Sequence, residues 1–192
     1  MMIKILAFSG STRSGSVNQK LLDIAAEGAA HAGAQVVSIR LSDYALPIYD
    51  GDLESQTGLS DNARALQQML RDSDALLIAS PEYNGGYSAL LKNTLDWMSR
   101  PGKDGTAGQT HFAGKPVAVV SASPGPLGGA RGQISLRHVL GRLGMLPIPQ
   151  EIALGHANDA FDGNNRLKDD KTDALVRGVG AALAKAAQKL AS

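Results

Sequence analysis

The hydrophobic positions of the chain form short apolar runs that are separated by longer, periodic segments. Nearly continuous runs lie at residues 3–9, 75–80 and 116–121, with weaker ones at 35–39 and 145–148. Apolar runs of this length without alternation are typical of strands buried on both faces of a parallel sheet. The pattern therefore predicts five strands.

Between the strands, apolar residues recur every three to four positions, as they do on one face of a helix. In residues 18–32, Leu21, Ala25 and Ala29 share such a face, and Gly33 follows at a position where helices commonly end. We predict further helices at residues 61–73, 88–98 and 130–143, and a long final helix through Leu175, Val179, Leu183, Ala186 and Leu190.

Strands and helices alternate five times, with no internal repeat and no linker. This order predicts an α/β fold: a doubly wound five-stranded parallel sheet with helices on both faces, formed as a single domain by residues 1–192. We expect irregular loops at 41–60, 101–114 and 155–166, the second of them mobile. In this architecture ligands bind beyond the carboxyl ends of the strands, where the strand order reverses. The loops after strands one, three and four are therefore where we expect a site.

Composition narrows the possible partners. The 192 residues carry a net charge of +1 with dispersed charges, which argues against a nucleic acid or a polybasic contact with a membrane. The chain has no cysteine, which excludes disulfides, thiolate metal sites and cysteine nucleophiles. Its four histidines lack metal-ligand spacing, and we predict no metal site. The first apolar run is too short for a signal peptide or membrane span, so we expect a cytoplasmic protein.

The loop after the first strand is rich in glycines and hydroxyls and carries one arginine: Gly10-Ser11-Thr12-Arg13-Ser14-Gly15-Ser16-Val17-Asn18. A strand, such a loop and a helix together form an anion site from free N–H groups and the helix dipole. Ser16 stands where a triphosphate loop needs lysine, and the dinucleotide pattern G-x-G-x-x-G is absent. A site of this kind suits a monophosphate and points to FMN. Alternatively, Ser16 and Asn18 only cap the helix and Arg13 is a surface charge.

The loop after the third strand offers groups suited to a flat heteroaromatic ring. Pro81 ends the strand, Tyr83 supplies an aromatic wall, and Asn84 supplies both a donor and an acceptor. The glycines that follow allow the backbone to approach a ligand closely. An ordinary turn with an exposed tyrosine is the alternative interpretation.

The loop after the fourth strand, residues 121–129, combines glycines and prolines with Ser121 and Ser123. We expect a nest of backbone N–H groups there, facing the pyrimidine end of a flavin. Donors aimed at that end would stabilise the negative charge that develops on reduction. The alternative is a flexible connector.

Four motifs occur in a fixed order along the first 150 residues: Gly10-Ser11-x-Arg13-x-x-Ser16-x-Asn18, Pro81-Glu82-Tyr83-Asn84, Lys92-Asn93-x-x-Asp96-Trp97 and Gly128-Gly129-Ala130-Arg131. Together they resemble the NAD(P)H-dependent FMN reductase family, which includes quinone, chromate and azo-dye reductases of the flavodoxin-like fold. Ser88 departs from the pattern, because many members carry proline there. Gly85-Gly86-Tyr87 is a second variation, on the substrate side.

The resemblance implies an FMN enzyme that passes hydride from NADPH or NADH, through flavin N5, to a quinone or a similar small-molecule acceptor such as free flavin, chromate or an azo compound. No catalytic side chain is then required, since the cofactor does the redox chemistry, and Glu82 is expected to be a loop residue. A homodimer or homotetramer with subunits in contact near the flavin is also implied. The predicted cofactor-binding residues are Ser11, Arg13, Ser16, Val17, Asn18, Pro81, Glu82, Tyr83, Asn84, Ser121, Ser123 and Gly125.

Two other functions stay open. One is a flavodoxin-like electron carrier without nicotinamide turnover, although such carriers are usually strongly acidic and this chain carries +1. The other is a binding or regulatory module that holds a different phosphorylated ligand.

Overall fold

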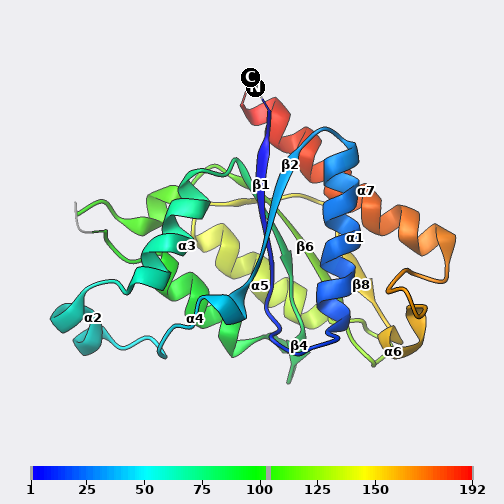
Figure 1. Ribbon diagram of the computed structural model, residues 1–192, viewed down its shortest axis with the longest axis horizontal. Coiled ribbons are helices and arrows are strands. Elements are labelled where there is room, and N and C mark those ends of the chain that lie inside the picture. The colour runs from blue at the N-terminus through cyan, green and yellow to red at the C-terminus, as the bar shows by residue number, and fades with distance from the viewer. Residues whose placement is uncertain (1, 103–104, 192) are drawn as a thin grey trace.

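A computed structural model of the protein describes residues 2–102 and 105–191. A central parallel sheet lies between two layers of helices (Figure 1). The strand order is β2-β1-β3-β6-β7, with β8 also paired to β6. The strands are β1 (Lys4–Ser9), β2 (Gln35–Arg40), β3 (Ala75–Ala79), β6 (Pro116–Ala122), β7 (Leu146–Pro147) and β8 (Ile152–Leu154). The order reverses between β1 and β3, as expected for the predicted doubly wound fold, which is confirmed.

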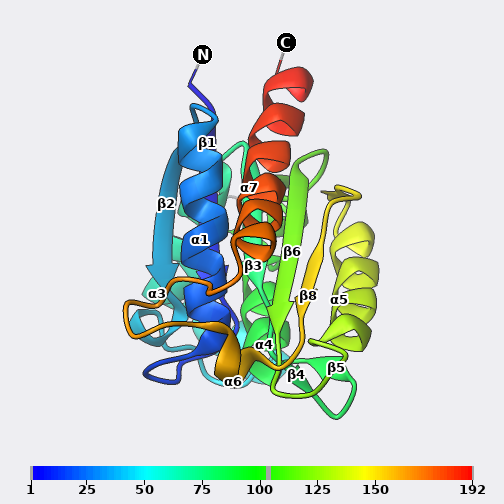
Figure 2. The ribbon, with the colours of Figure 1, turned by 90° about the vertical axis from the view of Figure 1, so that its right-hand side faces the viewer.

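The central strands are the apolar runs of the sequence. Every residue of β3 and β6 is buried, because helices cover both faces of the sheet. One face is covered by α1 (Val17–His31) and α7 (Asp170–Leu190), which lie side by side in Figure 2. The other face is covered by α3 (Asp61–Arg71), α4 (Ala89–Met98) and α5 (Ala130–Arg142). These five helices agree with the predicted ones.

The fifth position of the sheet differs from the prediction. The strand expected at 145–148 is only β7, which pairs with the start of β6, while β8 pairs with its end. Pro147 and Pro149 have no N–H to donate, so a continuous ladder cannot form across this segment. The edge is therefore made of two short strands, and β8 was missed.

Two segments expected to be irregular contain short helices. Residues 41–60 hold a 3₁₀ turn, η1 (Leu41–Asp43), and α2 (Gly51–Thr57), whose first turn is capped by the Asp50 carboxylate. No residue of α2 is buried, so the helix has no apolar face from which the sequence could predict it. Within 155–166 lies α6 (Ala157–Ala160).

The segment predicted as a mobile loop, 101–114, falls partly outside the described residues, at 103 and 104. Its described part contains the 3₁₀ turn η2 (Gly108–His111). No helix of the described chain combines the length and apolar character needed to cross a bilayer.

Candidate functional site

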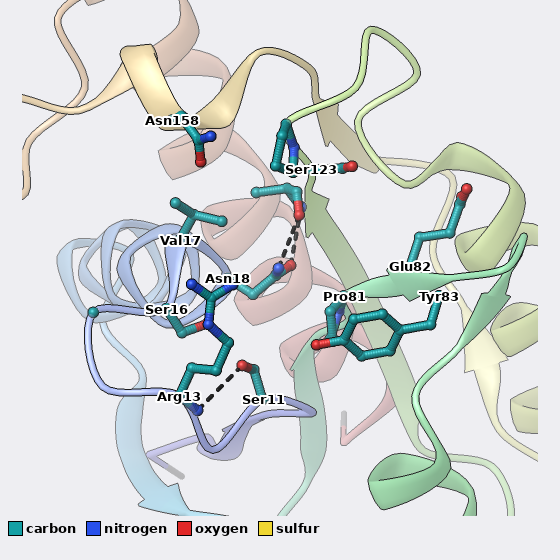
Figure 3. A pocket seen from close by; sticks show the side chains of 13 residues that line it. Ser11, Arg13, Ser16, Val17, Asn18, Pro81, Glu82, Tyr83, Ser123 and Asn158 are labelled. Carbon is teal, nitrogen blue, oxygen red and sulfur yellow. Dashed lines mark hydrogen bonds between the residues drawn. The ribbon is translucent and has the colours of Figure 1, made fainter.

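A pocket lies at the carboxyl ends of β1, β3 and β6, where the strand order reverses (Figure 3). Ligands of open α/β sheets bind at this point. The pocket is lined by Ser11, Arg13, Gly15, Ser16, Val17, Asn18, Pro81, Glu82, Tyr83, Ala122, Ser123, Pro124 and Asn158. All the predicted site residues line it except Asn84, Ser121 and Gly125.

The loop between β1 and α1 presents donors to one end of the pocket. Ser16 is the N-cap of α1, and its hydroxyl accepts a hydrogen bond from the Gln19 N–H at 3.4 Å. The backbone N–H groups of Val17 and Asn18 belong to the first turn, where a helix offers no internal acceptor. No described residue makes a hydrogen bond or ion pair with the Arg13 guanidinium, which turns toward these groups in Figure 3. Hydroxyls, N–H groups and one cation thus gather at a helix N-terminus, as an anion requires.

Ser88, at the start of α4, hydrogen-bonds to the loop between β1 and α1. Its hydroxyl donates to the Gly10 carbonyl at 2.8 Å and accepts from the Leu91 N–H at 3.2 Å, so it caps α4 and fixes the loop at once. A proline at this position has no hydroxyl for either contact. The departure from the family pattern at residue 88 therefore adds a contact under the site. Gly10 itself lies so close to α4 that a Cβ there would sit 2.4 Å from the Leu91 Cγ.

The Asn18 side chain makes its hydrogen bonds within the protein. Its side-chain amide donates to the Ala122 carbonyl at 2.8 Å, and its side-chain oxygen accepts from the Ala122 N–H at 2.9 Å. Both residues are buried, with exposed fractions of 3% and 2%. Both polar groups of the side chain are therefore bonded to the end of β6, so a contact from Asn18 to a phosphate, which stays a prediction, falls to its backbone N–H. It fixes the start of α1 against Ala122 and Ser123 on the opposite wall of the pocket.

The loop after β3 is a hairpin, formed by β4 (Glu82–Tyr83) and β5 (Gly86–Tyr87). Asn84 and Gly85 make its two-residue turn, with φ values of 52° and 78°. An Asn-Gly pair is a strong sequence signal for such a turn, and it was available in the sequence. Asn84 occupies the turn and does not line the pocket, whereas Tyr83 does and remains 55% exposed.

Glu82 points away from Arg13 and Asn18 and toward α5 (Figure 3). Its carboxylate accepts the Gly132 N–H at 2.9 Å and the Arg131 guanidinium at 2.7 and 3.0 Å. The Gly132 N–H is the largest of the influences that hold the pKa of Glu82 below its ordinary value, and the hydrogen bond and charge of Arg131 add to it. The side chain is only 8% exposed.

The hydrogen bonds of the buried Ser121 hydroxyl fix the conformation of the loop after β6. The Ser121 hydroxyl donates to the Gly128 carbonyl at 2.7 Å and accepts from the Gln133 amide at 2.7 Å, and the residue is fully buried. Ser121 does not line this pocket, and its hydroxyl positions the loop; its contact with the cofactor stays a prediction.

The expected nest of free N–H groups in this loop is largely used within the protein. The N–H groups of Ser123, Gly125 and Gly128 donate to the Leu154 carbonyl, the Ser123 hydroxyl and the Gly125 carbonyl. Gly125 does not line the pocket. What the loop presents to the pocket is the Ser123 side chain together with Ala122 and Pro124.

Asn158 was missed by the sequence analysis. It lies on α6, on the side of the pocket opposite Arg13 (Figure 3). The Ala157 N–H donates to the Ser123 carbonyl at 3.1 Å, and Ala157 is fully buried, so α6 is tied to the β6 loop. No local sequence pattern predicts Asn158, because its place beside the pocket depends on the contact between its neighbour Ala157 and the distant Ser123.

The residues present fit the phosphate end of FMN. The cation facing the pocket is Arg13, the acid that lines it (Glu82) is turned toward α5, and hydroxyls and helical N–H groups supply the remaining donors. The described residues contain no group of three or more histidine, aspartate or glutamate side chains placed to hold a metal ion.

The fold and the pocket together define a flavodoxin-like flavoprotein. The chain belongs to the NADPH-dependent FMN reductase family, whose sequence model matches residues 3–159, and it is therefore an oxidoreductase.

Individual relatives agree with this assignment. The chain is 39% identical, over 177 residues, to an NAD(P)H-dependent FMN reductase of Pseudomonas aeruginosa, covering 91% of this chain and 90% of that protein. It is 35% identical, over 181 residues, to a 2-hydroxy-1,4-benzoquinone reductase of a Burkholderia species, covering 90% and 89%. Its fold is similar to that of FerB, a flavoenzyme NAD(P)H:(acceptor) oxidoreductase from Paracoccus denitrificans, with a TM-score of 0.82, 28% identity and 98% of both chains covered.

Proposed function

We propose that the protein is an FMN-dependent NAD(P)H oxidoreductase that reduces a quinone or a similar small-molecule acceptor. The observation that carries the proposal is the anion site at the N-terminus of α1, which opens directly onto the Tyr83 hairpin. One pocket thereby offers groups suited to an anionic tail and to a flat ring. The family membership and the quinone reductases among the relatives support the same function.

At the phosphate end, the Ser11 and Ser16 hydroxyls and the N–H groups of Val17 and Asn18 would donate to the phosphate oxygens, and Arg13 would supply the charge. Hydrogen bonds to a charged acceptor are shorter and stronger than neutral ones. The donors are already oriented by the N-cap and by the bonds beneath the loop, so few groups lose freedom when the anion binds.

At the ring end, Pro81 and Tyr83 form one wall, and Ser123 offers a hydroxyl from the β6 loop. Bound FMN would supply the redox chemistry, the transfer of a hydride from the reduced nicotinamide to the acceptor. With one further proton from solvent, a quinone becomes a hydroquinone. The side chains of this chain bind and orient, and none is required to transfer a proton.

The mouth of the pocket is open beside Tyr83, which is 55% exposed. We propose that the nicotinamide and the acceptor use this one face in turn. We also propose a homodimer or homotetramer, on the ground of the family resemblance; light scattering of the purified protein tests this directly.

The function is tested by loading the purified protein with FMN, removing free FMN, and mixing with NADPH or NADH without oxygen. We expect rapid bleaching of the flavin absorbance and multiple turnovers when benzoquinone is added. Flavin that stays oxidised with both nicotinamides indicates an electron carrier. A protein that retains no FMN indicates a module for a different phosphorylated ligand.

A further inference from the structure

The N-terminus of α5 lacks a capping side chain of its own. Its N-cap residue is Gly129, in the left-handed region at φ 94°, and a glycine has no side chain to accept from the first turn. The Glu82 carboxylate, which comes from the β4–β5 hairpin, accepts the Gly132 N–H of that turn instead. An acidic side chain at this place satisfies an N–H group and complements the helix dipole.

The hairpin and α5 are also in close backbone contact. A Cβ added at Gly132 would lie 3.1 Å from the Gly86 carbonyl oxygen, tighter than most Cβ contacts, so β5 would have to shift by a few tenths of an ångström to make room for it. Figure 2 shows β4 and β5 beside the start of α5, at the end of the molecule where the strands finish. Strands of two residues are too short to hold a hairpin in place alone. Its position depends on α5.

Tyr83 is carried by this hairpin next to Glu82. Its side chain is largely exposed and lines the pocket, so core packing does not fix it. The position of the Tyr83 side chain in the pocket is therefore set by the position of the hairpin backbone.

We infer that Glu82 is a positioning residue for the cofactor ring: by joining the hairpin to the N-terminus of α5, its carboxylate sets where Tyr83 stands. The inference rests on the proposed function, since it concerns the flavin wall of the same pocket. Glu82 acts through Tyr83 and touches no reacting atom.

The two partners of the carboxylate contribute unequally. The Arg131 side chain is 64% exposed, and water screens an ion pair at such a site. The Gly132 N–H is part of the helix backbone and cannot swing away. The lowered pKa of Glu82, caused first by that N–H, keeps the carboxylate charged at neutral pH. Loss of the carboxylate should therefore matter more than loss of Arg131.

The test is a double-mutant cycle on FMN affinity, with Glu82→Gln, Tyr83→Leu and the double variant, each titrated with FMN. Glutamine keeps the size of the side chain and removes its charge. We expect Glu82→Gln to weaken FMN binding about tenfold, the scale of one lost hydrogen bond to a charged group, and Arg131→Gln to weaken it less. Because both changes act on one wall, their effects should not add.

A matched cycle pairs Glu82→Gln with Arg13→Ala, at the phosphate end, and there the effects should add. The visible circular dichroism of bound FMN should change in Glu82→Gln and stay as in the wild type in Arg131→Gln. Gly132→Ala should displace the hairpin without removing the Glu82 carboxylate, because the added Cβ would press on Gly86. Alanine also favours the helix, so α5 itself should not be weakened. We expect this variant to change the visible circular dichroism of bound FMN as well.

Additive effects of Glu82→Gln and Tyr83→Leu, or an unchanged spectrum in both Glu82→Gln and Gly132→Ala, would overturn the inference. If the wild-type protein binds no FMN, the proposed function fails and the inference fails with it. If the wild type binds FMN and reduces quinone but the coupling is absent, only the inference fails.

Discussion

Replacing Asn18 by alanine separates its structural role from the phosphate-binding role that the sequence suggested. The substitution removes two hydrogen bonds, of 2.8 and 2.9 Å, to the carbonyl and N–H of Ala122. Both Ala122 groups are then left buried without these partners, because the residue is 2% exposed. An unsatisfied buried polar group costs about 1–3 kcal/mol, so for two such groups we expect a loss of roughly 2–6 kcal/mol in the free energy of unfolding.

The loss is measured by urea and thermal unfolding of the protein freed of FMN, since a bound ligand would stabilise the folded state by itself. For a chain of this size, where 1 kcal/mol shifts the Tm by about 2–4 °C, the Tm should fall by about 4–24 °C. Asn158→Ala is the matched control, because Asn158 is exposed and on the same pocket; its unfolding free energy should change by less than about 0.5 kcal/mol.

An Asn18→Ala variant that is as stable as the control but binds FMN poorly would refute this reasoning. It would mean that the Asn18 side chain is a phosphate ligand after all.

Three further predictions concern neighbouring groups. Arg13→Ala should weaken FMN binding by about 1.5–3 kcal/mol, the worth of one charge-assisted contact, without lowering stability; an unchanged dissociation constant in a flavin titration would reject the assignment. Ser121→Ala should lower the unfolding free energy by about 1–3 kcal/mol, because the Gly128 carbonyl and the Gln133 amide lose a buried partner; urea denaturation decides it. The folded pKa of Glu82 lies below its ordinary 4.5, so its stabilisation is present above pH 4.5 and is lost as pH falls through the folded value. Unfolding measured between pH 7 and pH 3 should show a shallower loss in Glu82→Gln than in the wild type, and parallel curves would contradict this.

The sequence was most informative about elements whose residues are set by burial. β3 and β6 are buried along their whole length, and such strands have to be apolar without interruption. Once these strands are placed, the rule for doubly wound sheets brings the loops after β1, β3 and β6 to one edge. That is why most of the predicted residues line a single pocket.

Features without an apolar face, or made by distant partners, escaped prediction. The exposed helix α2 buries no residue, and the strand β8 is only three residues long. Asn18 and Ala122 are separated by 104 positions, and nothing in either local sequence indicates their pairing. The hairpin is a different case, since the sequence contains the Asn84-Gly85 turn signal, whereas Asn84 was predicted to bind the ring.

The central claim is that the N-terminus of α1 binds the phosphate of the cofactor. It is tested most directly by titrating the FMN-free protein with FMN and with riboflavin, which has the same ring and no phosphate. Two or more hydrogen bonds to a charged group are worth about 3 kcal/mol, so FMN should bind at least about 100-fold more tightly. Equal dissociation constants for the two flavins would contradict the account.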